Sequence, residues 1–324
     1  QADFTNATEV TAYAEILMGS YKNHAAMFEL KPDTKYYYIV GDKATDTYSS
    51  VCSITTREEN PSKVTFFHMS DTQDETYWGT YWNAALKSAY TLYPDGAFTL
   101  NTGDITNNGG KEIQWTNVFS NTAEYTQNNV VMPVSGNHDY WGDITRQFHC
   151  VYSHFNIDLN TDWNQDGYFG IYYSFDYGDV HFSVLNTGDT IETDNWDLTE
   201  EQVEWLKKDL AATNKKWKIV ALHNPLYSPG KYGSDTTFNR VALALRKQLN
   251  PIFAEYSVDL VLNGHDHVYS QSYPITASGT AVKDGEKKTI DGIVYYVKPQ
   301  GTIHLESGTA GSQNRGVLAT GRQY

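Results

Sequence analysis

Five short motifs combine aspartate, asparagine and histidine side chains, and each motif follows a short apolar run. They are Ser70-Asp71-Thr72-Gln73, Gly103-Asp104-Ile105-Thr106-Asn107, Gly136-Asn137-His138-Asp139, Ala221-Leu222-His223-Asn224-Pro225 and Asn263-Gly264-His265-Asp266-His267. Carboxylate, amide and imidazole groups with no thiol among them are typical ligands of Zn, Mn or Fe. The motifs therefore predict a site for divalent metal ions.

The spacing within two of the motifs supports the same chemistry. His265 and His267 are two residues apart, so they point the same way only where the backbone turns, and the preceding Gly264 permits that turn. A single carboxylate such as Asp104 can bridge two ions roughly 3.5–4 Å apart, the separation used by two-metal hydrolases. The pattern is thus compatible with a dinuclear centre.

The elements that would position these motifs are strands alternating with helices beyond about residue 60. The predicted strands are 64–69, 97–101, 130–134, 218–222 and 259–262. The predicted helices are 77–93, 112–126, 237–256 and one opened by the capping box Thr199-Glu200-Glu201-Gln202. Each motif then falls at the carboxyl end of a strand, where open α/β sheets build their sites. A predicted hairpin, 172–177 with 180–185, makes the sheet mixed.

The first 60 residues have a different pattern of predicted elements. Short strands are predicted over 9–18, 24–30, 35–40 and 49–56, with no helix signal. The run from Leu30 to Tyr36 resembles the L-x-P-x-T-x-Y signature of a fibronectin type III-like sandwich, in which the tyrosine makes a corner hydrogen bond. Such a sandwich usually needs about 100 residues, so this one is expected to be incomplete. We expect a small N-terminal β-sandwich domain over 1–60 and a second domain over 61–324, joined by a polar linker.

Length, charge and cysteine usage narrow the class of protein. The chain has 324 residues and a formal net charge of −15, which disfavours binding to nucleic-acid polymers or anionic membranes. No apolar run is long enough for membrane insertion, and the N-terminus lacks an initiator methionine and a signal sequence, so we expect either an artificially trimmed chain or a mature fragment. A charged fraction of 19% favours a secreted, periplasmic or cell-surface protein. Cys52 and Cys150 could form at most one disulfide, and their spacing does not decide whether they do.

Taken together and in this order, the five motifs resemble those of the calcineurin-like metallophosphoesterases. The preceding β-sandwich makes the chain most similar to the purple acid phosphatase branch and its bacterial relatives. This resemblance implies an α/β fold, a four-layer αββα sandwich, with two divalent ions. It implies that the first ion is held by Asp71, Asp104 and His267, and the second by Asp104, Asn137, His223 and His265. It also implies that His138 assists catalysis, and Asp139 is a candidate to orient the His138 imidazole.

The chain departs from that family pattern in three places. Asn107 stands where the purple enzymes have a tyrosine ligand, and Gln73 ends a motif that often reads D-x-H in the broader family. We expect Gln73 and Asn107 to complete the first ion's shell weakly, which favours an exchangeable divalent metal. The loop after His223 lacks the histidines of plant-type acid phosphatases, so the substrate contacts must differ. Lys231, Arg146 and Arg240 are candidates for them, although each also fits an ordinary surface cation.

The expected function is hydrolysis of a small-molecule phosphate ester, monoester or diester. The resemblance implies that a hydroxide bridging the two ions attacks phosphorus while His138 assists. Two alternatives stay open: a nucleotide or cyclic-nucleotide phosphodiesterase, and a non-catalytic glycan- or partner-binding module on the same fold. A separate calcium loop is a further hypothesis, with oxygen donors at Asp162, Asn164 and Asp166, although a plain Asx-rich turn explains the same residues.

Overall fold

The computed structural model describes residues 4–140, 149–155, 157, 172–193, 195–233, 239–313 and 315. The helices are α1 (Thr80–Leu92), α2 (Glu112–Thr126), α3 (His149–Phe155), α4 (Glu200–Ala212) and α5 (Arg240–Glu255), with a 3-10 helix at Thr187–Glu192. The strands of the first part of the chain are β1 (Tyr13–Leu17), β2 (Ser20–His24), β3 (Lys35–Tyr38), β4 (Gly41–Asp42), β5 (Thr47–Tyr48) and β6 (Cys52–Thr55). The later strands are β7 (Phe67–Met69), β8 (Phe98–Asn101), β9 (Val130–Pro133), β10 (Tyr173–Tyr177), β11 (Val180–Val184), β12 (Trp217–Ala221), β13 (Leu260–Asn263), β14 (Ser270–Gln271), β15 (Lys287–Ile290), β16 (Ile293–Tyr296) and β17 (Ile303–Glu306).

Two sheets form the centre of the molecule. Strands β7, β8 and β9 are parallel neighbours in a three-stranded sheet. The second sheet has the order β10-β11-β12-β13-β17-β14, in which the four central strands run parallel and the two edge strands run antiparallel. The predicted mixed sheet and its edge hairpin are confirmed.

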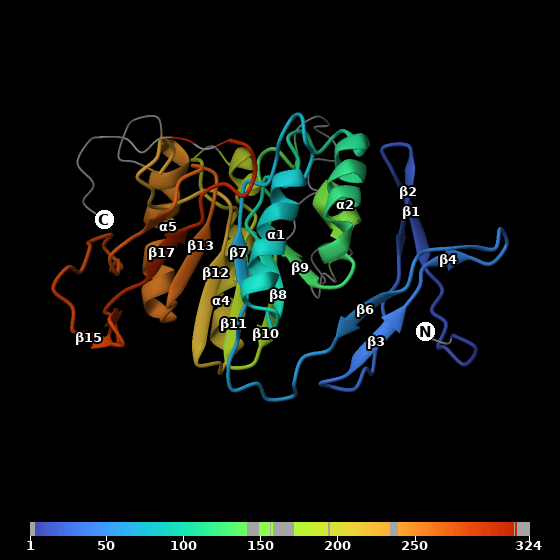
Figure 1. Ribbon diagram of the computed structural model, residues 1–324. Coiled ribbons are helices and arrows are strands. Elements are labelled where there is room, and N and C mark those ends of the chain that lie inside the picture. The colour runs from blue at the N-terminus through green and yellow to red at the C-terminus, as the bar shows by residue number, and fades with distance from the viewer. Residues whose placement is uncertain are drawn as a thin grey trace.

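The alternation of side chains along the strands produces two cores. On β12, Ile219 and Ala221 join the core between the two sheets, whereas Val220 packs under α4 and α5. The first core also takes Trp82 from α1 and Trp115 from α2, so these helices cover the three-stranded sheet. The order helix, sheet, sheet, helix is the predicted four-layer sandwich, and Figure 1 shows α1 and α2 on one side with α5 on the other.

Helix α1 begins three residues later than the pattern predicts, because Trp78 and Gly79 both adopt positive φ, which a right-handed helix does not allow. The Asp74 carboxylate holds this turn by accepting hydrogen bonds from the N–H groups of residues 76–79. Thr199 caps α4 as expected, its hydroxyl accepting from the Gln202 N–H at 3.4 Å.

The N-terminal part consists of three two-stranded sheets: β1-β2, β3-β6 and β4-β5. The strand predicted over 9–18 is present as the shorter β1. The chain then folds back at Met18-Gly19, both with positive φ, and β2, which was not predicted, pairs with β1 in a hairpin. The strand predicted over 24–30 does not extend beyond His24. The tyrosine corner is present, since the Tyr36 hydroxyl accepts a hydrogen bond from the Lys31 N–H at 2.8 Å.

This N-terminal part contacts α2, α3 and the chain just after α2. The Lys22 ammonium forms an ion pair with Glu112 at 2.8 Å, and Ser153 donates to Glu15 at 2.8 Å. The Tyr38 hydroxyl donates to the backbone oxygen of Gln127 at 2.6 Å. Cys52 and Cys150 are both buried, and no disulfide joins these two described residues. No helix of the described residues is long and apolar enough to cross a membrane.

Candidate metal centre

The five motifs meet at one edge of the two sheets. Asp71, Asp104 and Asn137 follow β7, β8 and β9, while His223 follows β12 and the pair His265 and His267 follows β13. Carboxyl ends of parallel strands share one sheet edge, so residues far apart in sequence come together. Four of them, Asp71, Asp104, His265 and His267, have φ between 52° and 74°. Such left-handed conformations in non-glycine residues are concentrated at functional sites.

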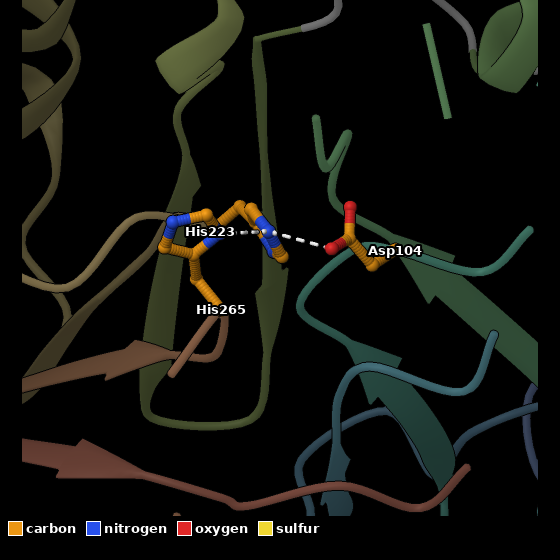
Figure 2. Close-up of side chains that lie close together, drawn as sticks. All are labelled: Asp104, His223 and His265. Atoms are coloured by element: carbon orange, nitrogen blue, oxygen red, sulfur yellow. Dashed lines mark hydrogen bonds and ion pairs between the residues drawn. The ribbon is translucent and has the colours of Figure 1, made fainter. Parts of the chain in front are cut away.

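Five side chains divide into two groups that share one carboxylate. In the first group, ligand-type atoms of Asp71, Asp104 and His267 lie within 4.8 Å of one another. The second group is Asp104, His223 and His265, within the same limit (Figure 2). Asp104 is the carboxylate that belongs to both, as its predicted bridging position requires.

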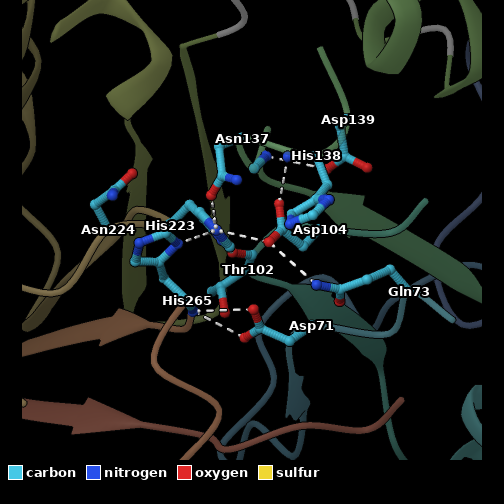
Figure 3. A network of polar contacts seen from close by, with 12 residues as sticks. Asp71, Gln73, Thr102, Asp104, Asn137, His138, Asp139, His223, Asn224 and His265 are labelled. Carbon is cyan, nitrogen blue, oxygen red and sulfur yellow. Dashed lines mark hydrogen bonds and ion pairs between the residues drawn. The ribbon is translucent and has the colours of Figure 1, made fainter. Parts of the chain in front are cut away.

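The contacts within the groups are short. Asp71 Oδ1 lies 3.1 Å from His267 Nε2, and Asp104 Oδ2 lies 3.2 Å from His223 Nε2. His265 Nδ1 is 3.2 Å from the same His223 nitrogen, and so is Asn137 Oδ1 (Figure 3). The structure thus brings together all six residues expected to hold metal.

Backbone carbonyls orient two of the imidazoles. The oxygen of Thr102 lies 2.8 Å from His223 Nδ1, and that of Gln313 lies 2.5 Å from His267 Nδ1. An imidazole that donates from Nδ1 presents Nε2 to a metal. Sequence reasoning missed both partners, because a backbone oxygen carries no residue-type signal.

The ligand-type atoms of the site lie so close together that hydrogen bonds alone cannot satisfy them, which fits a site for metal ions. His223 Nε2 is surrounded at 3.2 Å by Asp104 Oδ2, Asn137 Oδ1 and His265 Nδ1, and one proton on that nitrogen can satisfy only one of them. The Gln73 amide oxygen is buried without a hydrogen-bond partner beside the first group, while its amide nitrogen lies 3.3 Å from Asp104. A cation among these acceptors would satisfy the remaining lone pairs.

Burial and charge shift the pKa values of the site in compatible directions. Burial, aided by the neighbouring His223, lowers the pKa of His265 to about 3, which keeps this imidazole neutral. Burial also acts to lower the pKa of His223, but the Asp104 carboxylate outweighs it and raises that pKa to about 9. Burial acts to raise the pKa of Asp104, yet His223 holds it below its usual range. Without a metal ion, the protonated His223 imidazole therefore balances the negative charge of Asp104.

His138 lies beside the centre, and its orientation differs from the expected one. Its backbone N–H donates to Asp104 Oδ1 at 2.8 Å, and its Nδ1 lies 2.9 Å from the backbone oxygen of Asn107. Asp139, expected to orient this imidazole, instead accepts hydrogen bonds from the N–H groups of Ile105, Thr106 and Gly136. These donors occupy both of its oxygens, so Asp139 braces the turn that carries Asp104.

The two residues expected to complete the first shell have different positions. Gln73 lies within it, 3.3 Å from Asp104 and 3.4 Å from His267 Nε2. The Asn107 side chain points instead to Glu75, its amide donating at 3.2 Å, and only its backbone oxygen serves the site through His138.

The other candidates belong to neither group of ligand-type side chains or lie outside the described residues. Arg240 is exposed at the start of α5, and Lys231 is exposed with its ammonium 4.8 Å from the Tyr232 ring centre. Arg146 and the calcium-loop residues Asp162, Asn164 and Asp166 lie outside the described residues.

Comparison with known proteins agrees with this fold and site. The model of the calcineurin-like phosphoesterase family matches residues 64–269, and that of the purple acid phosphatase N-terminal domain matches residues 1–56. The chain belongs to the calcineurin-like phosphoesterase family. Within it, the resemblance to the purple acid phosphatases is confirmed by both sequence and structure.

Individual relatives show how far the similarity reaches. The chain is 32% identical to purple acid phosphatase 15 of Arabidopsis thaliana, over 44% of this chain and 25% of that protein. It is 26% identical to purple acid phosphatase 21 of the same plant, over 84% of this chain and 58% of the relative. The structure of purple acid phosphatase PPD1 from yellow lupin seeds superposes with a TM-score of 0.70 at 21% identity, covering 90% of this chain and 53% of that one. The chain thus spans less than two thirds of each of these proteins.

Proposed function

We propose that the chain hydrolyses phosphate esters with the help of two divalent metal ions, Zn, Mn or Fe. The observation that carries this proposal is the shared carboxylate: Asp104 belongs to both groups of ligand-type side chains. Asp71, Asp104 and His267 would hold one ion, and Asp104, Asn137, His223 and His265 the other. Gln73 would support the first group through its buried amide. The named activities of the acid phosphatase relatives support the same reaction class.

Bound ions would lower the pKa of coordinated water toward ~7 and offset charge on the phosphoryl group. The chain's own contribution centres on His138. Its Nδ1 is directed at the Asn107 carbonyl, so the opposite ring nitrogen is the one that can hold a proton against an ester oxygen. We assign His138 the role of protonating the leaving oxygen or of stabilising negative charge on the phosphoryl group.

Asp139 has a supporting role in this proposal. Burial, together with the Asp104 charge, raises the pKa of Asp139 to about 7. Its hydrogen bonds to the Ile105 and Thr106 N–H groups hold the turn after Asp104. Asp139 therefore keeps Asp104 directed at both groups without meeting substrate itself.

The test exchanges Asp104 for asparagine and uses a second Gly-Asp dipeptide as the control. Asp104→Asn should abolish hydrolysis of a chromogenic aryl phosphate in the presence of Mn or Zn, and should lower the bound metal per chain. Asp179→Asn changes the exposed residue of the hairpin turn Gly178-Asp179 and should leave both measurements unchanged. Wild-type turnover in Asp104→Asn would refute the proposal. Fewer than one metal per wild-type chain, with no gain on adding metal, would favour the non-catalytic alternative.

The same hydrolysis assay, run with different phosphate esters, identifies the class of substrate. A panel of phosphomonoesters, phosphodiesters and nucleotides, including cyclic ones, distinguishes a general phosphatase from a nucleotide phosphodiesterase. We expect small esters to be hydrolysed, since the net charge of −15 disfavours polyanionic polymers.

A further inference from the structure

The loop that follows His223 packs its Tyr232 against the metal centre. The Tyr232 ring centre lies 4.6 Å from that of His265, with the planes inclined by 51°. Tyr232 is half-buried and His265 is the least buried member of its ligand group. Tyr232 is therefore placed at the side of the centre that is open to solvent.

Asp266 holds this loop in place. Its side chain is 1% exposed, and it accepts hydrogen bonds from the N–H groups of Tyr232, at 2.8 and 2.9 Å, and Gly233, at 2.8 Å. A Cβ on Gly230 would lie 2.4 Å from the Asp266 carboxyl carbon, so the loop approaches as closely as glycine allows. Arg246 also donates to the Gly233 carbonyl at 2.7 Å. The position of Tyr232 is thus fixed by the residue between the two histidines His265 and His267.

Arg315 lies against the same tyrosine ring. The Arg315 guanidinium carbon is 5.8 Å from the Tyr232 ring centre, within the range of a cation–π contact. Its Nη1 donates to the backbone oxygen of His265 at 3.4 Å, and its backbone N–H donates to that of His267 at 3.2 Å. The positive charge of Arg315 also helps to lower the pKa of His265. Arg315 is therefore tied to both histidines of the β13 motif.

We propose that Arg315 contacts the anionic phosphoryl group of the substrate, with Tyr232 and Asp266 as the residues that position it. This inference rests on the proposed phosphoesterase function and names a substrate contact within it. In a chain with a net charge of −15, an anion needs a local cation. A guanidinium offers five N–H donors in a planar array that matches phosphate oxygens, and a single one is used by the His265 carbonyl among the described contacts. Lys231 contacts the same ring but is exposed, and we assign it no substrate contact.

The first experiment removes the charge of Arg315. Arg315→Gln should raise the KM for an aryl phosphate and the inhibition constant of inorganic phosphate by about tenfold, which corresponds to about 1.4 kcal/mol. Its kcat should change less than twofold, and its metal content should match that of the wild type. Arg315→Lys should recover part of the loss. Lys87→Gln removes an equal charge from the exposed face of α1 and should leave every parameter unchanged.

The second experiment tests the positioning role of the ring. Tyr232→Phe keeps the ring and should keep the wild-type KM, whereas Tyr232→Leu should raise KM as Arg315→Gln does. The double variant Tyr232→Leu with Arg315→Gln should be no worse than either single variant, since both changes remove one interaction. Fully additive effects would contradict the positioning role.

The outcomes separate this inference from the proposed function. If the wild type hydrolyses esters and Arg315→Gln keeps its KM and phosphate inhibition, the inference is wrong while the function stands. A raised KM in Lys231→Gln with none in Arg315→Gln would also overturn it. If the wild type hydrolyses none of the esters, calorimetric titration of metal-loaded protein with inorganic phosphate still tests the contact. Equal phosphate affinity in wild type and Arg315→Gln would then refute it.

Discussion

His304 is a buried histidine with no hydrogen bond to either ring nitrogen. It lies in β17 at 2% exposure, packed 4.8 Å from the Tyr227 ring centre. Burial, with the Arg246 charge acting in the same direction, lowers the pKa of His304 to about 3. The folded protein therefore keeps this imidazole neutral at pH values where the unfolded chain protonates it.

We predict that His304→Leu flattens the acid side of the stability curve. A lowered histidine pKa means that the unfolded state binds more protons below about pH 6.5, so the free energy of unfolding falls as pH falls toward 3. The contribution approaches about 1.4 kcal/mol per pH unit for one group. Urea unfolding at several pH values between 7.5 and 4.5 measures it, with pH 7.5 as the reference for the packing change. Parallel curves for wild type and variant would contradict the prediction.

The positions of the candidate metal-binding residues were predictable from sequence, whereas their hydrogen-bond partners were not. Asp71, Asp104, His223 and the β13 histidines lie directly after apolar strands, and topology alone brings such positions together. The orientation of His138 depends on the Asn107 backbone oxygen, which any residue would supply. Asp139 is the carboxylate nearest to His138 in the sequence, which made it the expected partner of the imidazole. In the structure the Asn107 oxygen takes that position instead.

At the scale of elements, the loops after β8 and β9 touch at a glycine. A Cβ on Gly136 would lie 2.2 Å from the Asp104 backbone nitrogen and 2.3 Å from Asp104 Oδ1. No side chain fits there unless one of the loops moves. The Gly136 N–H also donates to Asp139 at 3.0 Å, so Gly136 contributes one of the hydrogen bonds through which Asp139 holds the turn after Asp104.

Gly136→Ala should therefore lower metal occupancy and activity without unfolding the protein. We expect at least a tenfold loss of activity, because the added methyl group displaces the shared carboxylate Asp104. Metal analysis and thermal unfolding of the same preparation separate the two effects. Gly285→Ala is the control, since its Cβ would meet only the Tyr296 side chain at an ordinary 3.7 Å. Normal metal content in Gly136→Ala would contradict the prediction and show that the two loops can move apart to accommodate the methyl group.

Element boundaries were less predictable than element types. Helix α1 starts only at Thr80 because Trp78 and Gly79 adopt positive φ in the preceding turn. The apolar periodicity beginning at Tyr77 carries no information about that backbone conformation. Likewise, β1 covers only Tyr13–Leu17 of the strand predicted over 9–18, and β2 (Ser20–His24) fills the gap between that strand and the one predicted over 24–30.

Across the whole molecule, an ion pair between the buried Lys22 and the partly exposed Glu112 joins the N-terminal hairpin to the part of the chain that carries the candidate metal centre. Lys22 is 9% exposed in its side chain and pairs with Glu112 at 2.8 Å, while His154 lies 3.3 Å from the same carboxylate. Removing one partner of a buried pair leaves the other charge uncompensated, whereas removing both is far less costly.

Glu112→Gln should therefore loosen the β1-β2 hairpin, and adding Lys22→Met should restore it in part. Hydrogen exchange of residues 13–24 measures the change, which we expect to be an increase of about tenfold or more in Glu112→Gln. Exchange in β12 and β13 serves as the internal reference. A Glu112→Gln hairpin that exchanges like the wild type would show that the ion pair does not hold the two parts together.

Metal should also connect the two sheets. Asp71 and Asp104 follow strands of the three-stranded sheet, and His223, His265 and His267 follow strands of the six-stranded sheet. Any ion that binds only the folded arrangement stabilises it by mass action. Removing metal with a chelator should lower the Tm of the wild type by several degrees, and that of Asp104→Asn by much less. Equal shifts in both proteins would place the stabilising metal elsewhere.

The distance along the chain between the two halves of the centre has a consequence for biosynthesis. His265 donates its backbone N–H to Asp71, a residue made 194 positions earlier. At about 5–20 residues per second, a ribosome needs roughly 10–40 s to cover that interval. During this time, Asp71 and Asp104 have left the ribosome without the histidines that complete their groups. Under the proposed function, a nascent chain would therefore offer a metal ion only half a site, and metal loading would wait until β13 has emerged and joined its sheet.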